Sequence, residues 1–418
     1  SAHPELMDIR TKEDEELKII DFLGNKVVNE TKGLKPTFDV PVFPRVSPAE
    51  VAKLRGTKQL LDEQGPEAVS KWVMDQKRLL ITDTTMRDAQ QSLMATRVRT
   101  IDMEKIAPGT ALYGKDFFSL EMWGGATFDT AFRFLHENPW ERLATLRKLI
   151  PNIMFQMLIR GANAVGYKNY PDNVIREFVK QSAKAGIDVF RIFDALNWTE
   201  GMKIALDETL KQGKLAEACM CYTGDILDRS RTKYNLDYYI KLAKELEAEG
   251  AHIIGIKDMS GLLKPMAARE LIGELKQVLK IPVHLHTHDT SGNGIATVLM
   301  AAQAGVDIVD AAFNSMAGLT SQPGLNSIVA ALEHSSRDTE IAYEGIQQLS
   351  EYWRDVRPVY SSFESGLRTP SAEIYKYEMP GGQYSNLKAQ VDSFGLGYKF
   401  NEVKEMYRKV NLMLGDII

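Results

Sequence analysis

The sequence predicts a (β/α)8 TIM barrel of the α/β class, with an N-terminal extension and a C-terminal helical region. Eight short β-rich runs follow one another between residues 79 and 313. Helical segments lie between them, such as the amphipathic, glycine-terminated segment at 235–250, and strand–helix alternation predicts a parallel sheet. Eight such units in roughly 240 residues fit a closed barrel, which typically takes about 250 residues.

The eight runs are rich in apolar and β-branched residues, as buried strands are. An open, doubly wound sheet is the nearest structural alternative. Nucleotide binding by such a sheet is disfavoured because the first turn, starting at Thr84, has no glycine-rich phosphate loop. We predict strands at 79–83, 117–122, 153–159, 189–193, 217–222, 252–256, 283–287 and 308–313.

The regions on either side of the barrel have different patterns. In the extension, a Gly-Asn turn between two apolar runs predicts a small hairpin at 19–29. Helices are expected to start at Ser47-Pro48 and Gly65-Pro66, because proline is favoured in the first helical turn. Further helices are predicted at 324–334, 344–359 and 401–414. The N-terminal extension or linker, the barrel and the C-terminal helical region are expected to span 1–78, 79–335 and 336–418.

Composition excludes several classes of function. The 418 residues carry a formal net charge of -5 with both signs interspersed, which argues against binding to nucleic acid or to an anionic membrane. No apolar run reaches the roughly 18 residues of a membrane span, and no signal-peptide pattern opens the chain. The two cysteines, Cys219 and Cys221, are expected to be buried free thiols, which indicates a reducing, cytoplasmic location.

Three histidines alternate with other residues on and just after the seventh predicted strand. Residues two apart point to the same face of a strand, so His284, His286 and His288 are expected on one side. Histidine is the commonest metal ligand, and two imidazoles about 7 Å apart can reach one ion. The alternative is a strand whose histidines are hydrogen-bonded in the core.

The carboxyl ends of the predicted strands carry polar residues, and function sits at this end of a (β/α)8 barrel. Asp88, His286 and His288 form a nitrogen and oxygen set suited to Zn²⁺, Mn²⁺ or Co²⁺. Lys257 either pairs with Asp258 or Asp88, or has captured CO2 to become an anionic carbamate that binds the metal. The other polar residues near these ends are Arg87, Gln90, Gln91, Glu121, Asp129, Arg160, Tyr167, Asp194, Asn197 and Asn314.

Five segments carry a resemblance to a known family. They read LITDTTMRDAQQSLMATRVR at 80–99, WGGATFD at 123–129, QMLIRGANAVGY at 156–167, KDMSG at 257–261 and HTHDTSG at 286–292. From about residue 36 to its end, the chain resembles the carboxyltransferase domain of pyruvate carboxylase. The resemblance implies that the carboxyl group of N1-carboxybiotin is transferred to pyruvate to form oxaloacetate.

The resemblance also implies a metal site. Asp88, His286 and His288 would bind a divalent metal, with a carboxylated Lys257 as the fourth ligand. The metal would act as a Lewis acid on the enolate that forms from pyruvate.

A second group of residues is implied in substrate binding. Arg87 and Gln91 would contact the substrate. Arg160 would be held by Asp129 and Tyr167 where pyruvate and biotin meet. Arginine suits this task because its guanidinium stays charged and binds a carboxylate through two donors.

The resemblance implies partners beyond this chain. Biotin would come from a carrier domain that the chain does not contain, and identical subunits would form a dimer or tetramer. Gln90 and Ser260 stand where the family usually has histidine and alanine. The family also has a proton-shuttling threonine shortly after the stretch matching 415–418, as expected if this sequence is a piece of a larger multidomain enzyme.

Three other functions fit parts of the pattern. An oxaloacetate decarboxylase or transcarboxylase subunit would run the same chemistry with another partner. A metal-dependent aldolase or acyl-CoA lyase also has an Asp-x-x-x-Arg-Asp turn and a His-x-His pair, but does not need Lys257. A non-catalytic oligomerisation scaffold would have an empty metal site and would assemble through outer helices such as 235–250.

Overall fold

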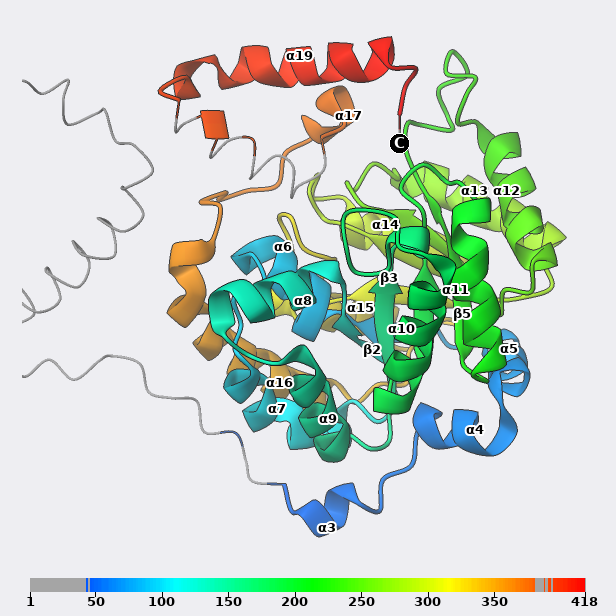
Figure 1. The fold of residues 1–418 in the computed structure, drawn as a ribbon, viewed down its shortest axis with the longest axis vertical. Helices are drawn as coiled ribbons and strands as arrows, with labels where there is room; N and C mark the ends of the chain where they lie inside the picture. The colour runs from blue at the N-terminus through cyan, green and yellow to red at the C-terminus, as the bar shows by residue number, and fades with distance from the viewer. Residues whose placement is uncertain (1–42, 44–45, 380–386, 388–389, 392–393, 418) are drawn as a thin grey trace, which may run out of the picture.

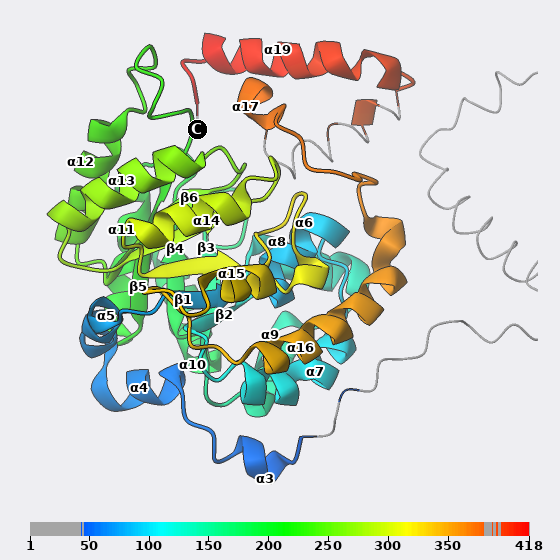
Figure 2. The same cartoon turned by 180° about the vertical axis from the view of Figure 1, so that it is seen from behind.

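The computed structural model of the chain describes residue 43 and residues 46–379, 387, 390–391 and 394–417. Within this part, eight parallel strands form one closed barrel in the order β1 to β8. Helices lie outside the strands, for example α10 and α11 in Figure 1 and α13 and α14 in Figure 2. The predicted (β/α)8 fold is therefore confirmed. The hairpin predicted at 19–29 lies outside the described residues.

All eight predicted strands are present, and their ends fall within two residues of the predicted ends. Every residue in them is buried, as expected for a parallel sheet whose two faces are both covered. The barrel closes where Ile81 of the first strand pairs with Val309 of the last. The strands are β1 (Leu80–Asp83), β2 (Ser119–Trp123), β3 (Met154–Ile159), β4 (Val189–Ile192), β5 (Leu215–Cys221), β6 (Ile253–Asp258), β7 (Val283–Thr287) and β8 (Ile308–Ala311).

The helices that connect the strands bury one apolar face against the barrel. In the helix predicted at 235–250, the Asn235 side chain accepts from the backbone N–H of Tyr238 at the start, and Tyr239, Leu242 and Leu246 are buried. The connecting helices are α6 (Gln90–Met94), α7 (Thr100–Tyr113), α8 (Gly125–Thr130), α9 (Pro139–Leu149), α10 (Asp172–Ala185), α11 (Glu200–Lys211), α12 (Leu236–Ala248), α13 (Pro265–Val278) and α14 (Gly294–Gln303), and α15 (Leu325–Leu332) follows the last strand.

In the described part of the chain, three helices precede the barrel: α3 (Pro48–Val51), α4 (Thr57–Gln64) and α5 (Pro66–Asp75). The predicted starts at Pro48 and Pro66 are confirmed, whereas α4 had no separate prediction. Val69 and Val73 of α5 are fully buried and belong to one apolar cluster with the first residues of several strands, including Leu80 and Met154. This cluster lies at the amino-terminal end of the barrel, away from the strand ends where the polar residues gather.

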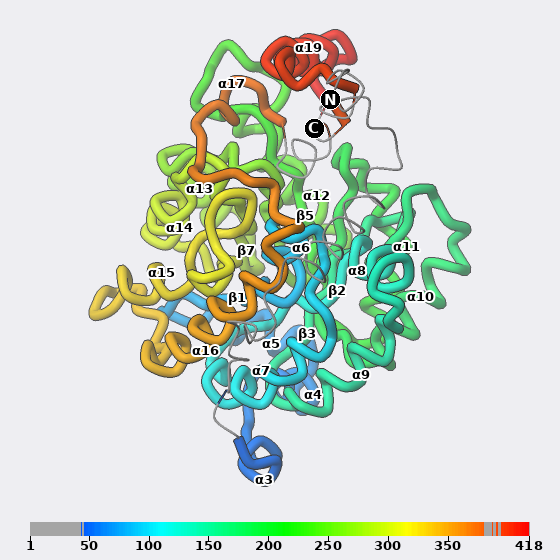
Figure 3. Tube along the Cα trace, turned by 90° about the vertical axis from the view of Figure 1, so that its left-hand side faces the viewer, coloured from blue at the N-terminus to red at the C-terminus, as the bar shows by residue number. Residues whose placement is uncertain are grey.

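The C-terminal region is helical, as predicted. It contains α16 (Tyr343–Val356), α17 (Ile374–Tyr377) and α19 (Phe400–Met413). Helix α16 lies beside α7 on the side of the barrel (Figure 3), and α19 lies over α17 at one end of the molecule (Figure 1). None of the helices in the described part of the chain combines the length and apolar character needed to cross a membrane. The thiols of Cys219 and Cys221 are free and buried, as predicted.

Candidate metal centre

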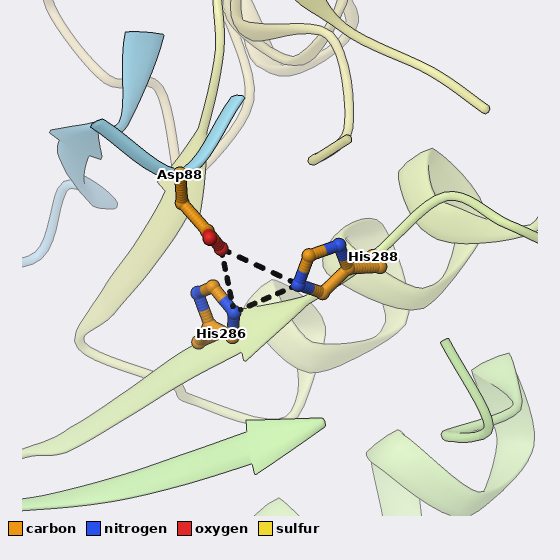
Figure 4. A group of neighbouring side chains, drawn as sticks. All are labelled: Asp88, His286 and His288. Atoms are coloured by element: carbon orange, nitrogen blue, oxygen red, sulfur yellow. Dashed lines mark hydrogen bonds and ion pairs between the residues drawn. The ribbon is translucent and has the colours of Figure 1, made fainter. Parts of the chain in front are cut away.

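Asp88, His286 and His288 converge at the carboxyl end of the barrel (Figure 4). Oδ2 of Asp88 lies 3.3 Å from Nε2 of each histidine, and the two Nε2 atoms are 3.2 Å apart. All three residues are buried. Two imidazole nitrogens and one carboxylate oxygen directed at one point are a donor set that fits a divalent transition metal.

The second nitrogen of each imidazole has its own partner. Nδ1 of His288 lies 2.6 Å from the backbone carbonyl oxygen of Thr320, and Nδ1 of His286 lies 2.5 Å from Oδ2 of Asp310. A carbonyl oxygen can only accept a hydrogen bond, so Nδ1 of His288 carries a proton, and Nε2 is the nitrogen that is directed at Asp88. Partners of this kind orient metal-binding histidines in proteins.

Asp88 lies in a turn of π-helix, η1 (Thr85–Ala89), which directly follows β1. Turns of π-helix are rare in proteins, and those that occur are often found at functional sites. Its Oδ1 accepts from Nη1 of Arg87 at 2.7 Å, and its Oδ2 accepts from Nε2 of Gln322 at 2.7 Å. Burial acts to raise the pKa of the Asp88 carboxyl, but Arg87 and the two histidines hold it well below its usual range. Asp88 is therefore an anion.

Lys257 lies next to this candidate metal site. It is the register partner of His286 across β6 and β7, and its side chain is buried, with 4% exposed. Its Nζ lies 5.2 Å from the centre of the Phe193 ring, and no carboxylate of the described residues is within 4.0 Å of it. The predicted alternative of an ion pair with Asp258 or Asp88 is thus not formed. Burial, and then the charge of Lys257, lower the pKa of His286 to about 3.

Arg87 and Gln91, which the resemblance implies in substrate binding, are in contact. Nη1 of Arg87 donates to Oε1 of Gln91 at 3.4 Å. The other end of the guanidinium donates to Oε1 of Glu121 at 2.5 Å. Arg87 is buried, so these acceptors and Asp88 fix its position at the edge of the metal centre.

Arg160 and Tyr167 come together, but Asp129 does not join them. The guanidinium of Arg160 lies 5.2 Å from the centre of the Tyr167 ring and donates to the carbonyl oxygen of Gly166 at 3.1 Å. Tyr167 is 72% exposed. Asp129 instead pairs with Arg133, one helical turn later, at 3.3 Å. The contact between Asp129 and Arg160 that the resemblance implies is therefore absent in this structure.

Two adjacent glycines at the start of α8, directly after β2, make room for both arginines. A Cβ atom on Gly125 would lie 2.3 Å from Nη1 of Arg160, and one on Gly124 would lie 3.2 Å from Cδ of Arg87. The first distance is far below van der Waals contact, so a side chain there would displace the guanidinium. The Trp-Gly-Gly motif thus has a steric role that the sequence reading did not assign.

His284 does not take part in the metal centre. Its Nδ1 lies 2.9 Å from Oε2 of Glu217, and its Nε2 lies 2.7 Å from Oδ1 of Asp310. Arg191 also contacts both carboxylates. Burial acts to raise the pKa of Asp310, but Arg191 and His284 hold it well below its usual range. For His284 the hydrogen-bonded core, stated above as the alternative, is the arrangement observed.

Three residues around the metal centre were not singled out from the sequence: Thr320, Gln322 and Asp310. Thr320 contributes only its backbone carbonyl, so its residue type carries no signal. Gln322 lies in a loop after β8 and is fully buried, which the sequence does not reveal. Asp310 could have been found, because it is a charged residue within an otherwise apolar predicted strand.

Two family models match parts of the chain. The model described as HMGL-like matches residues 217–352, and the model described as a conserved carboxylase domain matches residues 374–418. The pyruvate carboxylase of Bacillus subtilis is 58% identical over 419 residues, which are 99% of this chain and 36% of that protein. The mitochondrial pyruvate carboxylase of Homo sapiens is 47% identical over 427 residues, which are 100% of this chain and again 36% of that protein. The chain therefore spans about a third of the length of these curated relatives.

Solved structures give the same result. The carboxyl transferase domain of Rhizobium etli pyruvate carboxylase with pyruvate is 51% identical, with a TM-score of 0.89 and coverage of 96% of this chain and 68% of that chain. The same domain with pyruvate and biocytin is 52% identical, with a TM-score of 0.89 and coverage of 94% and 65%. This chain belongs to the family of pyruvate carboxylase carboxyltransferase domains.

Proposed function

We propose that the chain performs the carboxyltransferase half-reaction of pyruvate carboxylase, from N1-carboxybiotin and pyruvate to biotin and oxaloacetate. The observation that carries this proposal is the convergence of Asp88, His286 and His288 beside a buried Lys257 at the carboxyl end of the barrel. The family membership of the chain supports the proposed function, because the structure of a relative that is 51% identical has been solved with pyruvate.

Lys257 is proposed as the fourth metal ligand. A neutral amine adds to CO2 and loses a proton, which converts a cationic side chain into an anionic carbamate with oxygen donors. Burial, the absence of a carboxylate partner within 4.0 Å among the described residues and the register with His286 support this assignment. The complete set of two imidazoles and two acidic oxygens suits Mn²⁺, Zn²⁺ or Co²⁺. When bound, the ion would supply Lewis-acid stabilisation of negative charge.

The arginines are proposed to bind the substrate and to stabilise its enolate. A proton leaves the methyl group of pyruvate, and the enolate carbon then attacks the carboxyl carbon of N1-carboxybiotin. The bond from that carbon to N1 breaks, and N1 takes up a proton. Arg87 and Gln91 are proposed to hold the substrate. Arg160, whose guanidinium lies beside the Tyr167 ring, is proposed to oppose the developing charge. Asp129 is proposed to turn from Arg133 to Arg160 when substrate binds.

The partners, the oligomeric state and the location of the protein are proposed from its family resemblance. Biotin is proposed to arrive on a carrier domain, and the subunits are proposed to form a dimer or tetramer in the cytoplasm. The division into an extension, a barrel and a C-terminal helical region at residues 78 and 335 is likewise a proposal.

The test combines anomalous diffraction with one substitution. Crystals grown with bicarbonate are measured across the Mn, Co and Zn absorption edges. We expect one ion at the centre and density for a carbamate on Nζ of Lys257. Lys257→Ala should lose the ion, whereas Lys264→Ala, which removes a more exposed lysine paired with Asp225, should keep it. An unaltered metal content and turnover in Lys257→Ala would instead favour an aldolase or lyase, and wild-type crystals without an ion would refute the proposed metal site.

A further inference from the structure

We propose that Asp310 is a positioning residue, whose carboxylate fixes the tautomer and the orientation of His286 for metal binding. This inference rests on the proposed function, because it concerns the metal that the function requires. It concerns a residue that neither touches the metal nor lies among the predicted ligands.

The carboxylate of Asp310 contacts the ring nitrogen of His286 that faces away from Asp88. Oδ2 of Asp310 lies 2.5 Å from Nδ1 of His286, and Asp310 is fully buried on β8. Both oxygens of Asp310 contact the guanidinium of Arg191, so the carboxylate is an acceptor and Nδ1 of His286 carries the proton. Nε2 then has its lone pair free, and this atom faces Oδ2 of Asp88 at 3.3 Å.

Asp310 is itself held in place by Arg191 and His284. Its Oδ1 accepts from Nη2 of Arg191 at 3.0 Å and contacts Nε2 of His284 at 2.7 Å. Its Oδ2 is also paired with Nη1 of Arg191. The guanidinium therefore binds both oxygens of Asp310, which is a geometrically specific arrangement. The carboxylate cannot rotate without losing these bonds, so His286 receives a fixed acceptor.

Glu217 contacts the same two residues, Arg191 and His284, and is therefore a matched control for Asp310. Glu217 is also fully buried, and it accepts from Nε of Arg191 at 2.6 Å and contacts Nδ1 of His284 at 2.9 Å. It has no contact with His286 among the interactions of the described residues. Removing the charge of Glu217 thus perturbs the same ionic network without changing the partner of the metal ligand.

The experiment compares Asp310→Asn with the matched control Glu217→Gln, using Co²⁺ alone as the probe. Affinity is measured by competition with a chromophoric chelator, and the visible absorption of bound Co²⁺ reports the ligand geometry. Asp310→Asn should weaken Co²⁺ binding by roughly 10- to 100-fold, the usual effect of losing such a partner, and should alter the Co²⁺ spectrum. Glu217→Gln should leave the Co²⁺ affinity and the Co²⁺ spectrum close to those of the wild type. This should hold even if Asp310→Asn and Glu217→Gln each unfold at a lower urea concentration than the wild type.

A measurement on the unsubstituted protein covers the case in which Asp310→Asn fails to fold. Nitrogen-15 NMR of the metal-free chain, labelled at histidine, should show His286 protonated at Nδ1. An Nε2-protonated His286, or an Asp310→Asn variant with wild-type affinity and spectrum, would overturn this inference alone. Wild-type protein that binds no Co²⁺ would overturn the proposed function as well.

Discussion

Two of the groups of polar side chains in the barrel interior lie at different depths, and they differ in how their hydrogen-bonding atoms are satisfied. The deep network comprises Arg191, Glu217, His284 and Asp310, and each ring nitrogen of His284 faces a carboxylate oxygen. The upper group comprises Asp88, His286 and His288. There, Nε2 atoms of both histidines face each other and a carboxylate oxygen.

This difference separates residues that build the fold from residues that can bind a ligand. Cations and anions alternate in the deep network, so each charge has its partner within the protein, as buried charges require. In the upper group, three electron-pair donors converge on one point, which is the arrangement that suits a bound cation. His284 and His286 are two residues apart on one strand, so residue type and strand face alone do not decide which kind of site a histidine joins.

The largest effect is expected from breaking the deep network. Arg191→Met would leave Glu217 and Asp310 buried without their guanidinium. Removing one member of a buried ion pair typically costs about 3–5 kcal/mol, so we expect a loss of this size in the free energy of unfolding, measured by urea denaturation. A loss below about 1 kcal/mol would mean that the deep network does not depend on Arg191 and would remove the contrast between the two groups.

His288→Gln should strongly lower metal affinity but only slightly lower the free energy of unfolding. It removes one metal donor, so metal affinity should fall by more than the roughly 100-fold that loss of an outer partner can cause. The metal-free protein should lose only about 1 kcal/mol, the value of one hydrogen bond such as that to Thr320. Calorimetric titration with Zn²⁺ and urea denaturation with a chelator present measure the two quantities. A variant that keeps its metal would show that His288 is not a ligand.

The sequence was sufficient for the barrel and for the convergence of the candidate metal ligands because both follow from local patterns. Buried parallel strands are continuous apolar runs, so all eight were recognised, and strand-end positions brought Asp88, His286 and His288 together. Helix α4 was not predicted separately, because it starts after Gly56 without a side-chain cap.

Contacts made across the closed barrel could not be predicted in this way. Gln322 reaches Asp88 from 234 residues away in the chain, and Asp310 reaches His286 from the neighbouring strand. Both contacts depend on side-chain directions that only the assembled barrel sets. The contact implied between Asp129 and Arg160 shows the same limit, since the helical neighbour Arg133 takes Asp129 instead.

Asp129→Asn should give the smallest effect, and it sharpens the comparison by testing a charge that belongs to neither group. Its partner Arg133 is one helical turn away, and their side chains are 30% and 65% exposed. Exposed pairs of this spacing contribute about 0.3–0.5 kcal/mol, so Asp129→Asn and the control Arg133→Gln should both lower unfolding stability by no more than this and leave metal affinity unchanged. If Asp129 turns to Arg160 once substrate binds, as its proposed role requires, only Asp129→Asn should lower kcat/KM for pyruvate in the complete enzyme. Equal kinetics in the two variants would instead confine Asp129 to its helical ion pair.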